Sequence, residues 1–302
     1  MSNSNNNTSS STDDPHLYFY SPSTAAAVVF SVLYLLLTLW HFYINFIVAR
    51  RRFVKHKYTI PLFVAALIST VGWVVRILSV RNDTSIPLYA TSASLIVISP
   101  IFVCASLYLL LTRLIRATLP NGPAQSFFGI KPSWMGRLFI TSDVFSFLTQ
   151  CSGSGIASSG NWEGNLKDVG TNVLLVGLAL QLATFTVFLT VMVRFVRRVT
   201  RSRDTDFSPC VKKVVIGANI ASCFVQIRSI YRVVEFALGI DGYPFNHEWC
   251  LYVLEAAPMF CALAILAYYH PVHWMQDMPR AEVGLEHIGR NAKRPNAALS
   301  GA

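Results

Sequence analysis

Seven long apolar segments divide this chain, and they constrain its fold more than any other feature. Each has about the 20 residues that a helix needs to cross the hydrocarbon core of a bilayer. The segments are Ala25–Ile47, Tyr58–Ser79, Leu88–Thr112, Leu138–Ile156, Val169–Val193, Val214–Leu238 and Trp249–Tyr269. None shows the alternating hydrophobicity of a membrane strand. The sequence therefore predicts an all-α, polytopic membrane protein built as a bundle of seven transmembrane helices.

The composition supports this prediction. Only 13% of the 302 residues are charged, whereas 53% are hydrophobic. A soluble protein of this size has about a quarter of its residues charged, so much of this surface must face something other than water. The first 23 residues hold no Lys or Arg. We therefore expect no cleavable signal peptide, and the first apolar segment would direct insertion itself.

The basic residues indicate the orientation of the helices. They gather in alternate connections, for example at Arg50, Arg113 and Arg194, and again in the C-terminal tail. The connections on the other side hold only Arg81 and Lys167. Basic loops stay in the cytoplasm. We therefore predict an N-terminus outside and a C-terminus in the cytoplasm, most simply at the plasma membrane.

Three Asn-x-Ser/Thr sequons agree with this orientation. Asn6, Asn7 and Asn82 all fall on the predicted outer side and are candidates for glycosylation. The segment 24–275 would form the seven-helix domain. The flanking tails, 1–23 outside and 276–302 in the cytoplasm, are polar and are expected to be disordered.

Polar residues follow one face of three predicted helices. Ionisable groups in hydrocarbon cost several kcal/mol unless they are paired or hydrated, so these faces must turn inward. They are Arg228, Arg232 and Glu235 on the sixth segment, Asp143, Ser146 and Gln150 on the fourth, and Glu248, Tyr252 and Glu255 on the seventh. Their depths predict an outward-facing cavity with Asp143 at its floor.

Structural explanations compete with a role in binding. Arg76 has two readings of equal weight: it lines the binding site, or its aliphatic stem lets the guanidinium reach outward to water. Arg232 and Glu235 would form a clamp between helices, and Asp143 has a structural reading as strong as its functional one. Gly153 and Gly155 favour tight helix packing over a binding role.

These residues resemble the fungal lipid-translocating exporter family, also called the resistance-to-aminocholesterol-like (RTA-like) proteins. The resemblance extends from about Tyr18 to Met275. The stretches that carry it are Tyr20-Ser21-Pro22-Ser23, His41, Gly72-Trp73-x-x-Arg76, Ser99-Pro100 through Tyr108 and Arg113, Asp143 through Gln150 to Gly155, Gly177 to Gln181, Arg228 through Glu235, Gly239, His247-Glu248, Tyr252 and His270-Pro271. Two positions depart from the family pattern: Ser69 stands where an acid is expected, and Glu255 where Asp is expected.

The resemblance implies movement or release of amphipathic lipids, notably sphingoid long-chain bases, and resistance to toxic compounds. Carboxylates would then receive a cationic head while the alkyl tail stays in lipid. The candidate substrate-binding residues are Asp143, Gln150, Arg228, Arg232, Glu235, Glu255, Arg76, Gln181 and Tyr252. The expected partners are membrane lipids and an amphipathic small molecule, with no nucleic acid.

Two other function classes stay open. A seven-helix receptor or sensor for a lipid-like ligand would share this topology and signal through its cytoplasmic loops. A metal-dependent membrane hydrolase would need several converging ligands, and His270 and His273 have no obvious third partner. No Walker-type phosphate-binding motif is present. We therefore predict no enzyme activity and no cofactor, with any transport passive or driven by a gradient.

Overall fold

The computed structural model describes residues 23–48, 59–82, 85–118, 132–159, 164–201, 209–239 and 242–270. Within these ranges every regular element is helical. The helices are α1 (Thr24–Phe42), its π-helical continuation η1 (Tyr43–Val48), α3 (Ile60–Arg81), α4 (Ile86–Thr118), α5 (Pro132–Ser159), α6 (Gly164–Arg201), α7 (Pro209–Leu238), α8 (Tyr243–Asn246), α9 (Glu248–Cys250), η4 (Leu251–Ala256) and α10 (Ala257–Tyr268). Since α9, η4 and α10 follow one another directly, we call them together the last helix.

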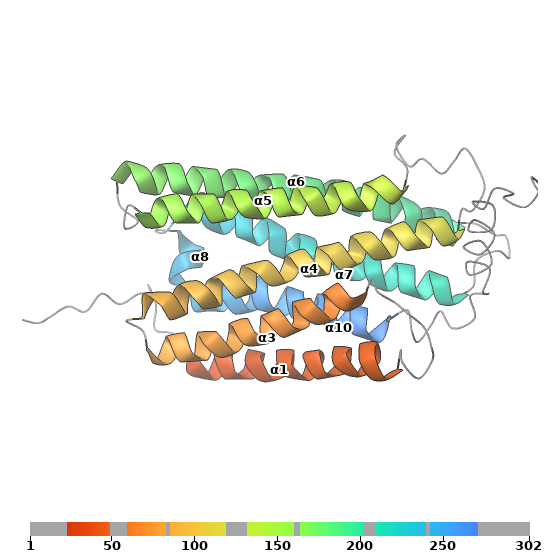
Figure 1. Ribbon diagram of the computed structural model, residues 1–302, viewed down its shortest axis with the longest axis horizontal. Helices are drawn as coiled ribbons and strands as arrows, with labels where there is room; N and C mark the ends of the chain where they lie inside the picture. Colours follow the sequence, from red (N-terminus) through yellow and green to blue (C-terminus); the bar gives the residue numbers. More distant parts are fainter. Residues whose placement is uncertain are drawn as a thin grey trace, which may run out of the picture.

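The long helices run side by side along the length of the molecule (Figure 1). Each of α1, α3, α4, α5, α6 and α7 packs against the next one in the chain, and the last helix packs against both α7 and α1. The bundle is therefore a closed ring, and side chains that point into it can meet across non-neighbouring helices.

Six of the described helices are long and apolar enough to cross a membrane. They are Thr24–Val48, Ile60–Arg81, Pro87–Ile115, Asn165–Arg201, Val211–Leu238 and Glu248–Tyr268. These spans match six of the seven predicted segments to within a few residues at most ends. Many large apolar side chains, such as Leu36 and Val176, are exposed on the outer faces of the bundle. The chain is an integral membrane protein.

The fourth predicted segment, Leu138–Ile156, is helical throughout and lies within α5. It is not among the six apolar spans, because Ser, Thr and Gly residues together with Asp143 and Gln150 lower its hydropathy. It therefore stays a prediction that α5 crosses the membrane and brings the number of spans to seven. The orientation of the termini stays a prediction as well.

Two glycines bring α5 and α6 into close contact. A Cβ atom added at Gly153 would lie 2.5 Å from the Leu174 nitrogen and 2.6 Å from the Gly170 carbonyl oxygen. One added at Gly170 would lie 2.5 Å from the nitrogen of Ala157. Small residues at a crossing let two backbones approach closely, which is how membrane helices gain packing energy. The tight-packing interpretation of Gly153 is confirmed.

Gly155 differs from Gly153. A Cβ atom there would meet nothing within 4 Å among the described residues. Packing therefore gives no reason for this second glycine.

The first described helix, α1, begins at Thr24. Ser23 caps α1, its Oγ accepting from the Ala26 N–H at 3.3 Å. At the other end α10 ends at Tyr268, two residues before His270. Asn82 is described and exposed at the end of α3. Asn6, Asn7 and nearly all of both predicted tails lie outside the described residues.

Candidate functional site

A buried ion pair joins α7 to the last helix. Arg228 Nη2 donates to Glu255 Oε1 at 2.8 Å, and the two side chains are 5% and 2% exposed. Removing one charge from such a pair leaves the other buried without compensation. Each side chain therefore depends on the other for its place inside the bundle.

Arg228 also reaches α4. Its Nη2 lies 3.4 Å from the carbonyl oxygen of Ile96. In a regular α-helix that oxygen accepts from the N–H four residues later, but here that residue is Pro100, which has no N–H. Arg228 supplies the missing donor, and α4 stays helical across Pro100. One guanidinium thus links α4 and the last helix to α7.

Arg232 and Glu235 form a second ion pair. Arg232 Nη1 lies 2.7 Å from Glu235 Oε2, within α7, and 3.5 Å from Glu255 Oε2 on the last helix. The hydroxyl of Tyr231 donates to the other oxygen of Glu235 at 3.2 Å. The sequence predicted Arg232 and Glu235 as a clamp between helices. The pairing is confirmed, but it lies within one helix because residues three apart share a face; the link between helices goes to Glu255.

A π-helical turn carries Glu255. The segment η4 spans Leu251–Ala256, and the N–H of Ala257 donates to the carbonyl of Tyr252, five residues earlier. Single π-turns inside α-helices occur often at functional sites. Here the π-turn contains Glu255 and positions its carboxylate toward both Arg228 and Arg232.

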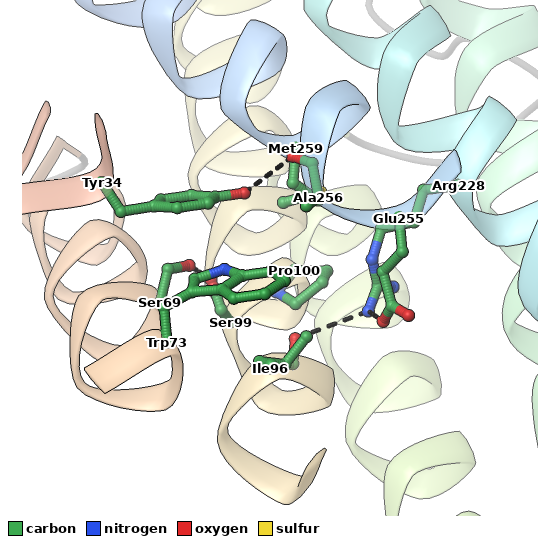
Figure 2. A pocket seen from close by; sticks show the side chains of 10 residues that line it. All are labelled: Tyr34, Ser69, Trp73, Ile96, Ser99, Pro100, Arg228, Glu255, Ala256 and Met259. Atoms are coloured by element: carbon green, nitrogen blue, oxygen red, sulfur yellow. Dashed lines mark hydrogen bonds and ion pairs between the residues drawn. The ribbon is translucent and has the colours of Figure 1, made fainter. Parts of the chain in front are cut away.

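An aromatic wall flanks the ion pairs. Trp73 of α3 stacks on Phe30 and Tyr252, with ring centroids 5.4 and 5.5 Å from its own, and the Tyr34 centroid lies 6.2 Å from that of Trp73. The Tyr34 hydroxyl donates to the carbonyl of Ala256 at 2.9 Å (Figure 2). This wall fixes the last helix against α1 and α3.

A small cavity lies between the aromatic wall and the Arg228–Glu255 pair (Figure 2). Its accessible volume is about 10 Å³, room for about one water molecule. The sequence predicted an open, outward-facing cavity. In this conformation the space is filled instead, because the charged side chains turn toward one another and the aromatic rings close over them.

The position of the missing acid is occupied by a serine pair. The hydroxyls of Ser69 and Ser99 lie 2.5 Å apart, and Ser99 also donates to the Ala65 carbonyl at 3.0 Å. Arg76, on the same helix as Ser69, is 4% exposed and lies beside Tyr252. Arg76 therefore turns into the bundle, and the outward-reaching arrangement that the sequence left open is not the one found.

Glu248 ties the start of α1 to the last helix. Its two carboxylate oxygens accept from the N–H of Ser23 at 3.0 and 2.8 Å, and one also accepts from the Tyr252 hydroxyl at 3.0 Å. Glu248 is only partly buried. It forms the rim of the cluster rather than its interior.

Asp143 lies apart from these ion pairs, where α5 faces α4. Its Oδ2 accepts from the Tyr108 hydroxyl at 2.7 Å, and the residue is 1% exposed. The other oxygen, Oδ1, has no hydrogen-bond partner in the described part of the chain, nor has the Ser146 hydroxyl one turn further on. The Tyr108 ring packs against Phe139 and Phe188, with centroids 5.2 and 4.6 Å away.

Gln150 and Gln181 meet between α5 and α6. The Gln150 amide donates to the Gln181 carbonyl oxygen at 2.9 Å. Gly177 makes room for this contact, since a Cβ atom there would lie 2.9 Å from the Ser146 carbonyl and 3.0 Å from Gln150 Cγ. This hydrogen bond between the two amides gives a structural reason for their place between α5 and α6.

The structure therefore divides the nine predicted site residues into two groups. The first, which we call the arginine–glutamate cluster, comprises Arg76, Arg228, Arg232, Glu235, Tyr252 and Glu255. The second group, on α5 and α6, comprises Asp143, Gln150 and Gln181. Sequence reasoning did not name four partners as site residues: Tyr34, Trp73, Ile96 and Tyr108. Trp73 and Tyr108 stand in the stretches that carry the family resemblance. Ile96 could have been found from the sequence, because Pro100 leaves the carbonyl four residues earlier without its helical donor.

No group of three or more His, Cys, Asp or Glu side chains that could hold a metal lies within the described residues. His270 is described and fully buried. His273 lies outside the described ranges.

Sequence comparison decides the family. A family model described as "RTA1 like protein" matches residues 62–278, which contain the arginine–glutamate cluster and the Asp143 site. The chain belongs to the RTA1-like family. No solved structure matches it.

Three relatives of this RTA1-like chain come from Saccharomyces cerevisiae. It is 30% identical over 210 residues to Protein RTM1, covering 68% of this chain and 65% of the relative. It is 31% identical over 212 residues to Protoporphyrin uptake protein 1, covering 69% and 66%. It is 23% identical over 257 residues to Sphingoid long-chain base transporter RSB1, covering 72% and 65%. The chain thus spans just under two thirds of the length of these relatives.

Proposed function

We propose that this RTA1-like chain moves amphipathic lipids with a cationic head, of the sphingoid long-chain base class, across the bilayer and so protects the cell from toxic compounds. The similarity to a protein named as a sphingoid long-chain base transporter supports this class. Another relative is named for the uptake of protoporphyrin, so family membership alone leaves the ligand open. The class of ligand must therefore be inferred from the residues of the site.

One observation carries the assignment of a cationic head. Three carboxyl groups are buried in the described residues: Asp143, Glu235 and Glu255. The two glutamates are already engaged by arginines. Asp143 has no ion-pair partner there, and its Oδ1 accepts no hydrogen bond. An ammonium group carries both the charge and the N–H donors that such a carboxylate needs.

The proposal includes a full seven-span topology with the N-terminus outside. Helix α5 would be the fourth span, polar because it carries Asp143 and packs closely on α6 through Gly153 and Gly170. The basic connections would lie in the cytoplasm. We place the protein in the plasma membrane, where movement of a toxic lipid out of the cell would be protective.

We further propose that the chain acts without enzymatic chemistry. Two of the yeast relatives are named for uptake or transport. Glu235 and Glu255 form ion pairs with arginines. The Asp143 carboxylate binds the cationic head of the lipid. Movement would then be passive or driven by a gradient.

The test is lipid movement in vesicles that contain the purified protein alone. A long-chain base with a fluorescent tail is placed in the inner leaflet, and its arrival outside is followed with an impermeant quencher. We expect faster movement than in protein-free vesicles, lost in Asp143→Asn. Thr149→Val is the matched control, because the Thr149 hydroxyl donates to the Phe145 carbonyl of its own helix.

A lipid receptor would give a different result in the same vesicles. It would bind the labelled base with an affinity that depends on Asp143, yet leave the rate of movement equal to that of protein-free vesicles. Binding without movement would therefore replace the transport proposal by the receptor.

A further inference from the structure

Asp143 is buried more deeply than its few partners explain. At about 1.5 Å per residue it lies roughly 16 Å from the Pro132 end of α5 and roughly 24 Å from the Ser159 end. If α5 spans the bilayer, Asp143 lies well inside the hydrocarbon core. A free carboxylate there is costly, and Glu235 and Glu255 avoid that cost by pairing with arginines.

The groups that face Asp143 are neutral. From α4, the Tyr108 hydroxyl donates a hydrogen bond to Asp143, and the Cys104 thiol lies within electrostatic range of the carboxylate. From its own helix, the Ser146 hydroxyl lies one turn away without a partner in the described residues. The phenylalanines of α6, Phe185 and Phe188, pack on the Tyr108 ring.

The arginine–glutamate cluster does not neutralise Asp143 either. Arg228 lies within electrostatic range of Cys104, but its guanidinium is bound to Glu255. Within the described residues no Arg or Lys forms an ion pair with Asp143. Within the described residues, the charge of this carboxylate is therefore not cancelled by a fixed cationic side chain.

We infer that Asp143 binds a proton whenever it does not hold the cationic head of a lipid, so that the protein exchanges one lipid cation for one proton. This inference rests on the proposed function. When the ammonium group arrives, the carboxyl releases its proton to water on the side then open; when the ammonium leaves, the carboxylate takes up a proton. The site stays neutral in both states, and each cycle moves one positive charge each way.

The local geometry suits such an exchange. Tyr108 engages one carboxylate oxygen and leaves Oδ1 available for the proton or for an ammonium N–H. The Ser146 hydroxyl, one turn away and without a partner in the described residues, offers an acceptor for an ammonium N–H. The exchange therefore needs no second charged residue at this site.

The first test is transport driven by a pH gradient in vesicles with the purified protein. The probe is a long-chain base with a quaternary ammonium head, which cannot lose a proton and so cannot cross as a neutral amine. We expect it to accumulate on the acidic side, up to about ten-fold for a gradient of about one pH unit. Asp143→Asn should abolish the accumulation, whereas Asp143→Glu should keep it and Thr149→Val should not change it.

The second test measures the proton itself and needs no transport. Infrared difference spectra of the reconstituted protein, recorded with and without the quaternary probe, should show the carbonyl stretch of a protonated carboxyl disappear on binding. Asp143→Asn should lack that band, and Thr149→Val should retain it.

The two tests separate the inference from the proposed function. Movement of the probe that ignores the pH gradient, with no carboxyl band, overturns the exchange and leaves lipid transport standing. If no lipid moves in any vesicle, the proposed function fails, and with it the exchange. A band that persists in Asp143→Asn would assign the proton to another residue and overturn the inference as well.

Discussion

Pro100 and Arg228 are complementary: the carbonyl of Ile96, which Pro100 leaves without a helical donor, lies 3.4 Å from the guanidinium of Arg228. The same guanidinium binds Glu255. A helix defect on α4 and a charge on α7 are therefore satisfied together, and a buried arginine becomes a structural joint of the bundle.

Loss of this joint should be strongly destabilising. Arg228→Gln leaves Glu255 without its closest ion pair, at an expected cost of about 3 to 5 kcal/mol. The double variant Arg228→Gln with Glu255→Gln should recover part of that loss, because no uncompensated charge remains. The measurement is the thermal unfolding of the purified protein in detergent, with Cys223→Ser on the exposed side of α7 as the control. A double variant as unstable as the sum of the singles would show that the two residues are not partners.

Arg232 and Glu235 should also be coupled, but less strongly than Arg228 and Glu255. Arg232 has a second carboxylate 3.5 Å away in Glu255, and Tyr231 supports Glu235. We expect Glu235→Gln to lower the free energy of unfolding by less than Glu255→Gln does. The Arg232→Gln and Glu235→Gln single variants should each lose about 1 to 4 kcal/mol, and the double variant should be more stable than either of them. A double-mutant cycle of unfolding temperatures gives the coupling; a cycle that sums to zero would contradict it.

Asp143→Asn should fold and lose function. Within the described residues Asp143 accepts one hydrogen bond, from the Tyr108 hydroxyl, and an amide oxygen accepts it equally well. We expect normal abundance at the cell surface but no protection from a toxic long-chain base, measured as growth in cells that depend on this protein. Protection equal to that of the parent at equal surface level would make Asp143 part of the scaffold.

The crossing of α5 and α6 should be sensitive to size at one glycine and insensitive at another. A methyl group at Gly153 would lie 2.5 Å from backbone, so Gly153→Ala should cost about 1 to 3 kcal/mol. Gly155→Ala, two residues away, meets open space and should have little effect. Unfolding temperatures of the two purified variants test this; equal stabilities would mean that α5 and α6 are not packed as described.

The topology can be tested at opposite ends of the bundle. A cysteine in place of Asn82, exposed at the end of α3, should react with an impermeant thiol reagent on intact cells. A cysteine in place of Arg201, exposed at the end of α6, should react only after the cells are permeabilised. The reverse pattern would invert the predicted orientation.

The arrangement of the helices along the chain was readable from the sequence. Hydropathy over about 20 residues reports directly whether a helix is stable in lipid, so six spans were predicted to within a few residues at most ends. The polar faces were readable too, because residues three and four apart lie on one side of a helix. Arg232 and Glu235 were paired correctly for that reason. Segment Leu138–Ile156 was predicted as a helix, but its polar face lowered the same hydropathy signal.

Only the tertiary structure decided which polar groups meet. Arg228 with Glu255, Asp143 with Tyr108, and Gln150 with Gln181 are partners from different helices. Such pairs depend on how each helix is rotated and how deep it lies in the bundle. Glycine contacts between helices and the π-turn η4 determine this rotation and depth, and no local sequence pattern encodes them. The closure of the cavity has the same origin. Once α7, α4 and the last helix are in register, opposite charges pair with one another, and the open space that the sequence suggested is filled.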